Sequence, residues 1–391
     1  MNIAIIGGGI GGLAAAVALR ARGLEVAVYE RSAELKEIGA GLRLTPNALK
    51  ALRAMGLEAD AMAVGVRIDK STTRSWRSGR VISVQDTSAT RYGASALTIH
   101  RADMLDLLQR KIPDVAVHLG AACTAVESDK NTAIARFANG SEVEADVIIG
   151  ADGIHSAVRE SLFGPDKPAF TGCICWRGLV PIERYAHEAN GTTRWLGPHG
   201  HVVSYPVRRG ELLNFVAHYD SDAWSGESWT QEAEREELIQ TYARWNEAVL
   251  RMLDASNQHY KWALYDRAPM EAWSKGRATL LGDAAHSMLP YLSQGTSMTL
   301  EDAWVLAEEL ARTPVNPTAA LQRYEQLRMP RTRRAQLGSR ARAKENHLSS
   351  PLARLRRDFL TTMRARFGAD KTPDGVSWIY DYDVSRLNRA E

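Results

Sequence analysis

Apolar and polar residues follow two different periods along this chain, and the change of period divides it. The first apolar run, Asn2 to Ile6, is rich in β-branched residues, and an alanine- and leucine-rich stretch with helical spacing follows it as far as Gly23. A second apolar run covers Glu25 to Tyr29. A strand, a helix and another strand in this order predict a βαβ unit and an α/β fold.

The period becomes two between residues 172 and 273. Four short runs alternate in this way, at Ile174 to Pro181, Thr192 to Leu196, His201 to Val207 and Leu212 to Tyr219. Such alternation predicts an antiparallel sheet, here inserted into the first fold. We therefore expect a Rossmann-like domain in two parts, 1–171 and 274–330, an inserted antiparallel-sheet domain at 172–273, and a C-terminal helical segment at 331–391.

Further elements follow from the same patterns. Residues Glu142 to Gly150 indicate one strand, and Ala278 to Leu281 indicate another. Helical spacing is expected at Gln231 to Leu253, Leu300 to Arg312, Asn316 to Gln336 and much of 337–367.

Composition narrows the class of protein without identifying it. Apolar residues make up 45% of the 391 residues, charged residues 24%, and the net charge is +3. These values are typical of a globular protein and give no indication of nucleic-acid binding. Three cysteines are too few for a disulfide framework, and no apolar run reaches the length of a membrane span. We expect a cytoplasmic monomer or homodimer with no membrane or nucleic-acid partner.

Glycines at the head of the first predicted helix indicate a dinucleotide site. Gly7, Gly9 and Gly12 form GxGxxG directly after the first strand, and Glu30 ends the second strand with Arg31 beside it. This spacing turns the chain, brings pyrophosphate close to the backbone and places an acid where it can bind a ribose. An acidic ribose partner would repel a 2′-phosphate, which disfavours NADP at this position.

A second glycine-rich stretch lies late in the chain. Gly282 and Asp283 follow the apolar strand at 278–281, and Gly295 precedes an amphipathic helix. A carboxylate at a strand end, a glycine turn and a helix N-terminus suit a polyol chain attached to an electron-rich ring. Taken alone, Gly-Asp is as compatible with an ordinary turn.

The stretch from Gly276 to Ala303, GRATLLGDAAHSMLPYLSQGTSMTLEDA, resembles the GD fingerprint of FAD-dependent aromatic hydroxylases. The usual pattern has Pro at the position of Ser287 and Gly-Ala or Gly-Gly where Gly295-Thr296 stand. A companion motif, GADGxxSxxR, spans Gly150 to Arg159. The resemblance implies a p-hydroxybenzoate hydroxylase-like fold and places the chain in the branch of salicylate, 3-hydroxybenzoate and 6-hydroxynicotinate hydroxylases.

This resemblance implies roles for particular residues. Asp283 would hold the ribityl chain of FAD and Arg101 would reach the same cofactor. Asp152, Gly153 and Arg159 would form a motif shared by FAD and NAD(P)H. The segment at 201–205 implies that His201 takes the proton of the substrate hydroxyl while Tyr205 donates a hydrogen bond to the ring. Without the resemblance, these two would be ordinary residues on a sheet face.

The substrate side is less determined. Arg43 would meet a substrate carboxylate, although a solvated arginine fits its position equally well. The charge of a carboxylate could also be met by other arginines, Arg177, Arg194, Arg208 and Arg209. If His201 were not the base, the loop that carries Arg43 or His286 would be the next place to look.

The function implied is a single-component monooxygenase with bound FAD, a transient NADH or NADPH, and O2 as oxidant, acting through a flavin hydroperoxide. Its expected substrate is a small phenol or hydroxypyridine that carries a carboxylate. Alternative substrates are a nitrophenol or a polycyclic metabolite. Other protein classes are an NAD-dependent dehydrogenase, which would not need Asp152 or Asp283, and a flavin-fold binding protein such as the GDP dissociation inhibitors.

Overall fold

The computed structural model describes residues 1–35, 41–113, 116–185, 191–221, 235–256, 259–367 and 375–387. Its first layer is a six-stranded sheet in the order β18-β19-β12-β1-β2-β8. The strands are β1 (Asn2–Ile6), β2 (Glu25–Tyr29), β8 (Val117–His118), β12 (Val147–Gly150), β18 (Ser274–Lys275) and β19 (Ala278–Leu280). Because β1 pairs in parallel with β2 and β12, and β12 with β19, the late glycine stretch lies beside the early one.

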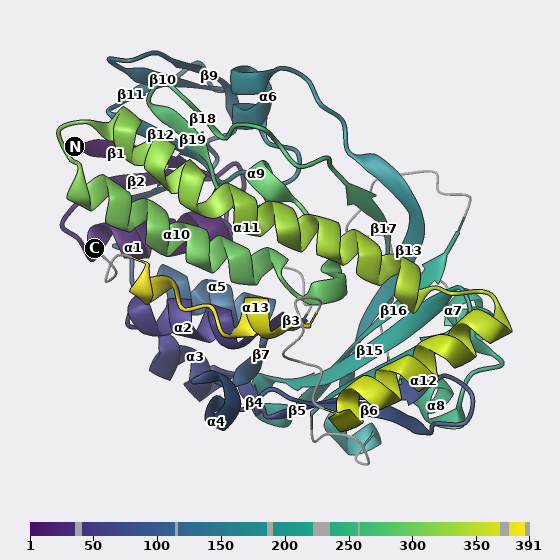
Figure 1. The fold of residues 1–391 in the computed structure, drawn as a ribbon. Helices are drawn as coiled ribbons and strands as arrows, with labels where there is room; N and C mark the ends of the chain where they lie inside the picture. The colour runs from purple at the N-terminus through teal and green to yellow at the C-terminus, as the bar shows by residue number, and fades with distance from the viewer. Residues whose placement is uncertain are drawn as a thin grey trace.

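Helices cover this sheet. Helix α1 (Ile10–Arg20) packs against α10 (Gly295–Arg312), and α10 runs beside α11 (Pro317–Asn346), as Figure 1 shows. The predicted start of α10 at Leu300 was five residues late, because the helix begins directly at Gly295. The helix expected to end at Gln336 instead continues to Asn346, and α12 (Pro351–Phe367) follows after a short break.

The strand predicted from Glu142 to Gly150 is two strands in different sheets. Strand β11 (Glu142–Ala145) pairs with β10 (Ala133–Phe137), which pairs with β9 (Cys123–Ser128). Strand β12 belongs to the six-stranded sheet. At the junction, Asp146 accepts a 2.7 Å hydrogen bond from Asn2 N, and the pattern changes from alternating EVEA to the fully buried run VIIG.

The second layer is a seven-stranded sheet in the order β17-β13-β16-β15-β14-β5-β6. Its strands are β13 (Ala169–Pro181), β14 (Thr192–Gly197), β15 (Gly200–Val207), β16 (Leu212–Asp220), β17 (His259–Asp266), β5 (Lys70–Ser75) and β6 (Val81–Asp86). The four predicted strands are confirmed. Residues 172–273 do not build the sheet alone, however, since the β5–β6 hairpin joins it through a parallel pairing of β5 with β14. This hairpin covers an edge that β14 would otherwise expose.

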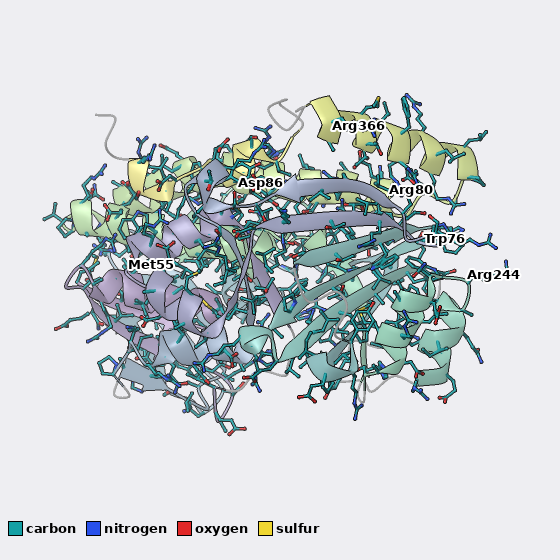
Figure 2. The ribbon with its side chains drawn as sticks, turned by 90° about the horizontal axis from the view of Figure 1, so that it is seen from below. Met55, Trp76, Arg80, Asp86, Arg244 and Arg366 are labelled. Carbon is teal, nitrogen blue, oxygen red and sulfur yellow. The ribbon has the colours of Figure 1, made fainter. Side chains whose placement is uncertain are left out.

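One face of this second sheet is closed by its own core. Helices α7 (Arg235–Tyr242) and α8 (Glu247–Asp254) pack over buried Trp176, Trp195 and Phe215. The single helix predicted from Gln231 to Leu253 is thus two helices, broken before the N-cap Asn246, and residues 231–234 lie outside the described part. Figure 2 shows Trp76 and Arg80 at the outer end of the β5–β6 hairpin. The opposite face of the sheet is not covered by these two helices and is turned toward the first layer.

The remaining elements connect the two layers. Strands β3 (Gly41–Leu44), β4 (Val66–Ile68) and β7 (Ala96–His100) form a small sheet. The other helices are α2 (Pro46–Ala54), α3 (Glu58–Val64), α4 (Ala89–Tyr92), α5 (Arg101–Gln109), α6 (Ala157–Phe163), α9 (Asp283–His286) and α13 (Ser377–Tyr380). Across the described residues, no helix combines the length and the apolar character that a membrane crossing requires.

Candidate active site

The glycine loop after β1 is shaped by close backbone contacts. A Cβ on Gly12 would lie 1.9 Å from the carbonyl oxygen of Gly7, so only glycine allows this approach. Gly7 has a φ of +110°, which side-chain-bearing residues rarely adopt. Gly9 differs from both, since a Cβ there would meet no atom within 4 Å. The protein leaves open space beside Gly9, at the N-terminus of α1, where an anionic group is stabilised.

Glu30 lies against the same loop. One carboxylate oxygen accepts a 2.6 Å hydrogen bond from Gly8 N and the other a 2.9 Å bond from Ser32 N. These bonds hold the end of β2 next to the glycines. A cavity of about 500 Å³ opens here, and its lining includes most of the predicted cofactor residues, Gly7, Gly9, Glu30, Arg31, Arg101, Asp152, Gly153, Asp283 and Gly295.

Asp283 reaches this cavity from the other motif. Gly282 has a φ of +63°, and a Cβ on it would lie 2.9 Å from the Thr299 hydroxyl oxygen, so the turn requires glycine. Asp283 then begins α9 with an exposed side chain, while the next three residues are buried. The carboxylate is therefore held at a fixed place with its oxygens accessible from the cavity.

The residues of the GADGxxSxxR motif separate into two groups. Asp152 lines the cavity, and its carboxylate accepts hydrogen bonds from Ser156 Oγ at 2.5 Å and Val158 N at 3.2 Å, which fixes the start of α6. Burial raises the pKa of Asp152. Arg159 is buried behind the cavity, paired with Asp166 at 2.5 Å and donating to Ala284 O at 3.2 Å. Its hydrogen bond to Ala284 links α6 to α9. Arg159 is not among the described residues that line the cavity.

A second cavity, of about 510 Å³, continues from the first under the seven-stranded sheet. The two share the residues Arg101, Asp283, Gly295 and Thr296. The combined space runs from the glycine loop to the sheet. The groups that line it are of the kinds FAD needs: backbone N–H donors at the glycine loop, which would meet the pyrophosphate, and the acceptors Glu30 and Asp283, which would meet ribose and ribityl hydroxyls.

Strand register places a defined row of side chains over this second cavity. Arg194, Val203, Val216 and Arg177 stand directly opposite one another on β14, β15, β16 and β13. All four line the cavity. Two valines flanked by two arginines present an apolar surface with positive charge on either side, which suits a flat ring bearing an anionic group.

The next row carries two histidines. His201 stands opposite His218, and the two rings stack with centroids 4.4 Å apart and planes 8° apart. His201 is 2% exposed, and its Nδ1 lies 3.0 Å from Nε2 of His347. Burial lowers the pKa of His201 well below its ordinary value, and the neighbouring His218 and His347 lower it further. His201 is therefore neutral at pH 7, so that one of its two ring nitrogens is an acceptor.

Tyr205 lies at the other end of the cavity. Its hydroxyl donates a 2.8 Å hydrogen bond to Gly41 O, and Gly41 N donates at 2.8 Å to Oδ1 of Asn214, which stands opposite Tyr205 in the sheet. The predicted donation from Tyr205 to the substrate is therefore not what this geometry provides, because the proton already goes to the backbone. Burial raises the pKa of Tyr205 to about 12, so its oxygen is a neutral acceptor beside the cavity.

The structure discriminates among the candidate arginines. Arg208 pairs with Asp103 at 3.6 Å and Arg209 donates to Ala63 O at 3.0 Å, and both lie away from the cavity lining. Arg43, Arg177 and Arg194 line the cavity.

The three candidate arginines that line the cavity have N–H groups that the described part of the chain leaves without hydrogen-bond partners. Nε and Nη2 of Arg43, and Nε of Arg194 and Arg177, are buried without a hydrogen-bond partner among the described residues. Burial and the nearby cations Arg342, Arg357 and Arg43 lower the pKa of Arg194 to about 9. An anion entering the cavity would relieve this repulsion.

His286 belongs to a different, fully buried network. Its Nε2 lies 2.5 Å from Asp302 Oδ2, and Arg328 joins Asp302 at 2.8 Å and Glu301 at 2.7 Å. Arg331 adds a second ion pair to Glu301 at 2.8 Å. This network joins α9, α10 and α11, and His286 is not among the described residues that line either cavity. It stabilises the loop and is no alternative base.

Several site residues escaped the sequence interpretation, namely His218, Asp220, Tyr291, His347 and Tyr380. His218 had a signal: the turn around Arg208 to Gly210, with strands on both sides, brings residue 218 opposite 201. Tyr380 had one too, because the aromatic stretch Ser377 to Asp383 resembles the C-terminal segment of the salicylate hydroxylase branch. His347 had none, because it follows α11 and reaches its place through the packing of that helix.

The fold and the site define an FAD-dependent monooxygenase of aromatic rings. The chain belongs to the family described as FAD binding domain, which matches residues 1–338. It is 41% identical to 3-amino-4-hydroxybenzoate 2-monooxygenase PtnB3 of Streptomyces platensis, over 98% of this chain and 96% of that protein. It is also 34% identical to 6-hydroxynicotinate 3-monooxygenase of Pseudomonas fluorescens, over 86% of this chain and 89% of that one.

Solved structures agree with this assignment. A salicylate hydroxylase substrate complex superimposes with a TM-score of 0.84 at 28% identity, covering 98% of this chain and 96% of that chain. Klebsiella pneumoniae HpxO in complex with FAD and uric acid gives a TM-score of 0.86 at 27% identity, covering 98% and 96%. The predicted fold, cofactor and enzyme class are thereby confirmed, with O2 and NADH or NADPH as co-substrates.

Proposed function

We propose that this enzyme hydroxylates a hydroxybenzoate-type ring, with 3-amino-4-hydroxybenzoate as the first substrate to test. The observation that carries the proposal is the row of Arg194, Val203, Val216 and Arg177 beside the His201–His218 pair. A ring over the two valines would have a cation at its edge and a neutral imidazole within the same cavity. The similarity to three 3-amino-4-hydroxybenzoate 2-monooxygenases of Streptomyces, at 41%, 40% and 37% identity, supports the choice of ring.

The chain's own residues would bind and activate the ring. Arg43 and Arg194 would hold the carboxylate, because their unpaired N–H groups and mutual repulsion favour an anion between them. His201 would accept the proton of the ring hydroxyl, since a free phenol with a pKa of about 10 stays protonated at neutral pH. Bound FAD, reduced by NADH or NADPH, would activate O2 for transfer of one oxygen atom to the ring.

Tyr205 would act through the backbone. By fixing the Gly41 carbonyl it holds β3, the strand that carries Arg43, against the sheet. A Cβ on Gly41 would lie 2.6 Å from the Tyr205 ring, so the contact depends on glycine as well. Tyr205 is thus proposed to position the carboxylate site.

The test is a comparison of substrates with oxidised NADH and hydroxylated product measured together. We expect 3-amino-4-hydroxybenzoate, or another hydroxybenzoate, to give product in proportion to NADH consumed. The carboxylate-free 2-aminophenol should bind poorly. Product from nitrophenols or polycyclic phenols, with none from any hydroxybenzoate, would contradict the proposal in favour of the alternative substrates.

The carboxylate partners can be tested by matched substitutions. Arg43→Gln and Arg194→Gln should each raise KM for a carboxylated substrate by about 10- to 100-fold, the size of a charge-assisted hydrogen bond. Arg208→Gln removes an arginine paired with Asp103 outside the cavity and serves as the control. Equal KM values in all three variants would place the carboxylate elsewhere.

Cytoplasmic location and a monomeric or homodimeric state remain predictions.

A further inference from the structure

A chain of hydrogen-bonded groups leads from His201 to the protein surface. His201 Nδ1 lies 3.0 Å from His347 Nε2, and His347 Nδ1 lies 2.5 Å from Asp220 Oδ1. His201 is 2% exposed, whereas the side chain of His347 is 8% exposed and that of Asp220 is 40% exposed. Exposure thus rises at each step away from the cavity. Beyond Asp220, His199 Nδ1 lies 3.8 Å from Oδ2, with its side chain 52% exposed.

This series of hydrogen bonds determines which nitrogen of each imidazole ring carries the proton. An ionised Asp220 can only accept, so His347 Nδ1 donates to it and His347 Nε2 keeps a lone pair. His201 Nδ1 must then donate to that lone pair, which leaves Nε2 of His201 as the acceptor. Within the described part of the chain, no hydrogen-bond partner occupies His201 Nε2, and His201 lines the substrate cavity.

We propose that His347 and Asp220 conduct the proton of the substrate hydroxyl from His201 to solvent and fix the tautomer in which His201 receives it. The inference rests on the proposed function in that it takes a phenolic ring as ligand. The hydroxyl O–H bond breaks as His201 Nε2 gains the proton, His201 Nδ1 gives its proton to His347 Nε2, and His347 Nδ1 gives its proton through Asp220 to water. The ligand is left as a phenolate. On the return a proton enters at His347 Nδ1 through Asp220, His347 Nε2 gives its proton to His201 Nδ1, and His201 Nε2 gives its proton back to the oxygen of the ligand or product, which restores the original tautomers.

The surroundings explain why the proton moves on. A proton held on His201 would face the stacked His218 ring and the cations Arg194 and Arg357. Burial, His347 and Arg177 also lower the pKa of His218, so the second ring offers no resting place for the charge. Tyr291 packs on both rings, and burial, with the nearby Cys173, raises the pKa of its hydroxyl above the ordinary value. The exit through His347 ends at the partly exposed carboxylate of Asp220.

A metal ion is the competing occupant of this place. One ligand atom each from Cys173, Asp220 and His347 lies within 4.8 Å of the others. The atoms have partners already, because His347 bonds directly to Asp220 and Tyr291 donates to Cys173 Sγ at 3.3 Å. Burial raises the pKa of the Cys173 thiol to about 12, which disfavours the thiolate that a metal needs.

The experiment follows ionisation of a bound phenol, independently of turnover. A phenolic ligand such as 4-hydroxybenzoate is mixed with the oxidised holoenzyme in weak buffer, and the phenolate absorbance and a pH-indicator dye are recorded by stopped flow. His347→Gln keeps an oxygen that can accept from His201 but cannot pass a proton on. We expect unchanged FAD retention and ligand affinity, with phenolate formation and proton release slowed about 10-fold or more.

Further variants separate conduction from folding. Asp220→Asn should slow the same step, and His347→Gly should regain its rate in proportion to added imidazole, which a merely structural role would not produce. The control is His118→Gln, an exposed imidazole on β8 outside both cavities. Proton release at the wild-type rate in both His347→Gln and Asp220→Asn would overturn the proposal.

Two other outcomes are distinct. If the purified protein contained stoichiometric zinc or iron, and Cys173→Ser lost it, the result would contradict the proton relay and support a metal site. Failure of every hydroxybenzoate to be hydroxylated by the wild type would defeat the proposed function, but phenol ionisation could still be measured with any phenol that binds.

Discussion

The two halves of the active site are built by different means. Around the glycine loop, recognition lies in the backbone: Gly9 leaves space, Gly12 permits contact with Gly7, and Glu30 bonds to the loop itself. Under the seven-stranded sheet, recognition lies in side chains brought into rows by strand pairing. The cofactor half thus depends on short motifs, whereas the substrate half depends on register and on distant segments.

This difference means that the halves should fail separately. A substitution in the sheet cavity should have little effect on FAD, because the residues expected to hold the cofactor lie in the loops that join β1 to α1 and β19 to α9. A residue of the glycine loop should weaken FAD while leaving the rows of the sheet in place. Substitutions in each half test that separation.

The largest effect is expected for His201→Ala. Loss of the proton acceptor should lower product formation by about 100-fold or more, the size typical of general-base loss. FAD affinity should stay at the wild-type value, and NADH oxidation should fall less than hydroxylation, with hydrogen peroxide making up the difference. Product per NADH consumed is the measurement; full coupling at normal turnover would show that the base lies elsewhere.

Asp283→Ala should have the next largest effect, in the cofactor half. The ribityl hydroxyls lose a charged acceptor worth about 1.5 to 3 kcal/mol, which corresponds to roughly 10- to 150-fold in Kd for FAD. Flavin fluorescence titration of the apoprotein measures this loss. Asp146→Ala, a carboxylate at the outer end of the same sheet, is the control. Unchanged affinity would remove Asp283 from the cofactor site.

Two glycines of one motif should respond differently. A Cβ at Gly12 meets Gly7 O at 1.9 Å, so Gly12→Ala should lower the free energy of unfolding by about 1 to 3 kcal/mol. Gly9→Ala meets no protein atom within 4 Å and should leave the apoprotein stable while weakening FAD. Thermal unfolding of the apoproteins, followed by FAD titration, distinguishes them. Equal Tm values would show that the loop relaxes more easily than its packing implies.

The smallest effect is expected for Tyr205→Phe. Removal of the hydroxyl leaves Gly41 O without its donor at a cost of about 1 kcal/mol. Because β3 carries Arg43, we expect KM for a carboxylated substrate to rise a few-fold, with coupling nearly unchanged. A loss of coupling as severe as that of His201→Ala would instead give Tyr205 a direct part in the chemistry.

Much of the cofactor half could be predicted from the sequence alone. The strand, the GxGxxG spacing, Glu30 and the Gly282-Asp283 pair are local features whose geometry follows from glycine conformations and chain direction. Resemblance to a known family added Arg101 and Asp152, and both line the cavity. Arg159 shows the limit, because spacing could not reveal that its side chain turns back toward Asp166.

The substrate half was decided by the tertiary structure. The sequence identified His201 and Tyr205 on one strand face. Only the tertiary structure placed His218 opposite His201 and let the hydroxyl of Tyr205 donate to the carbonyl oxygen of Gly41. Only the packing of α11 brought His347 against His201, 146 residues away in the chain. Local motifs are set by short-range backbone sterics, whereas pairing register and helix docking depend on the burial of the whole core, which no single stretch of sequence contains.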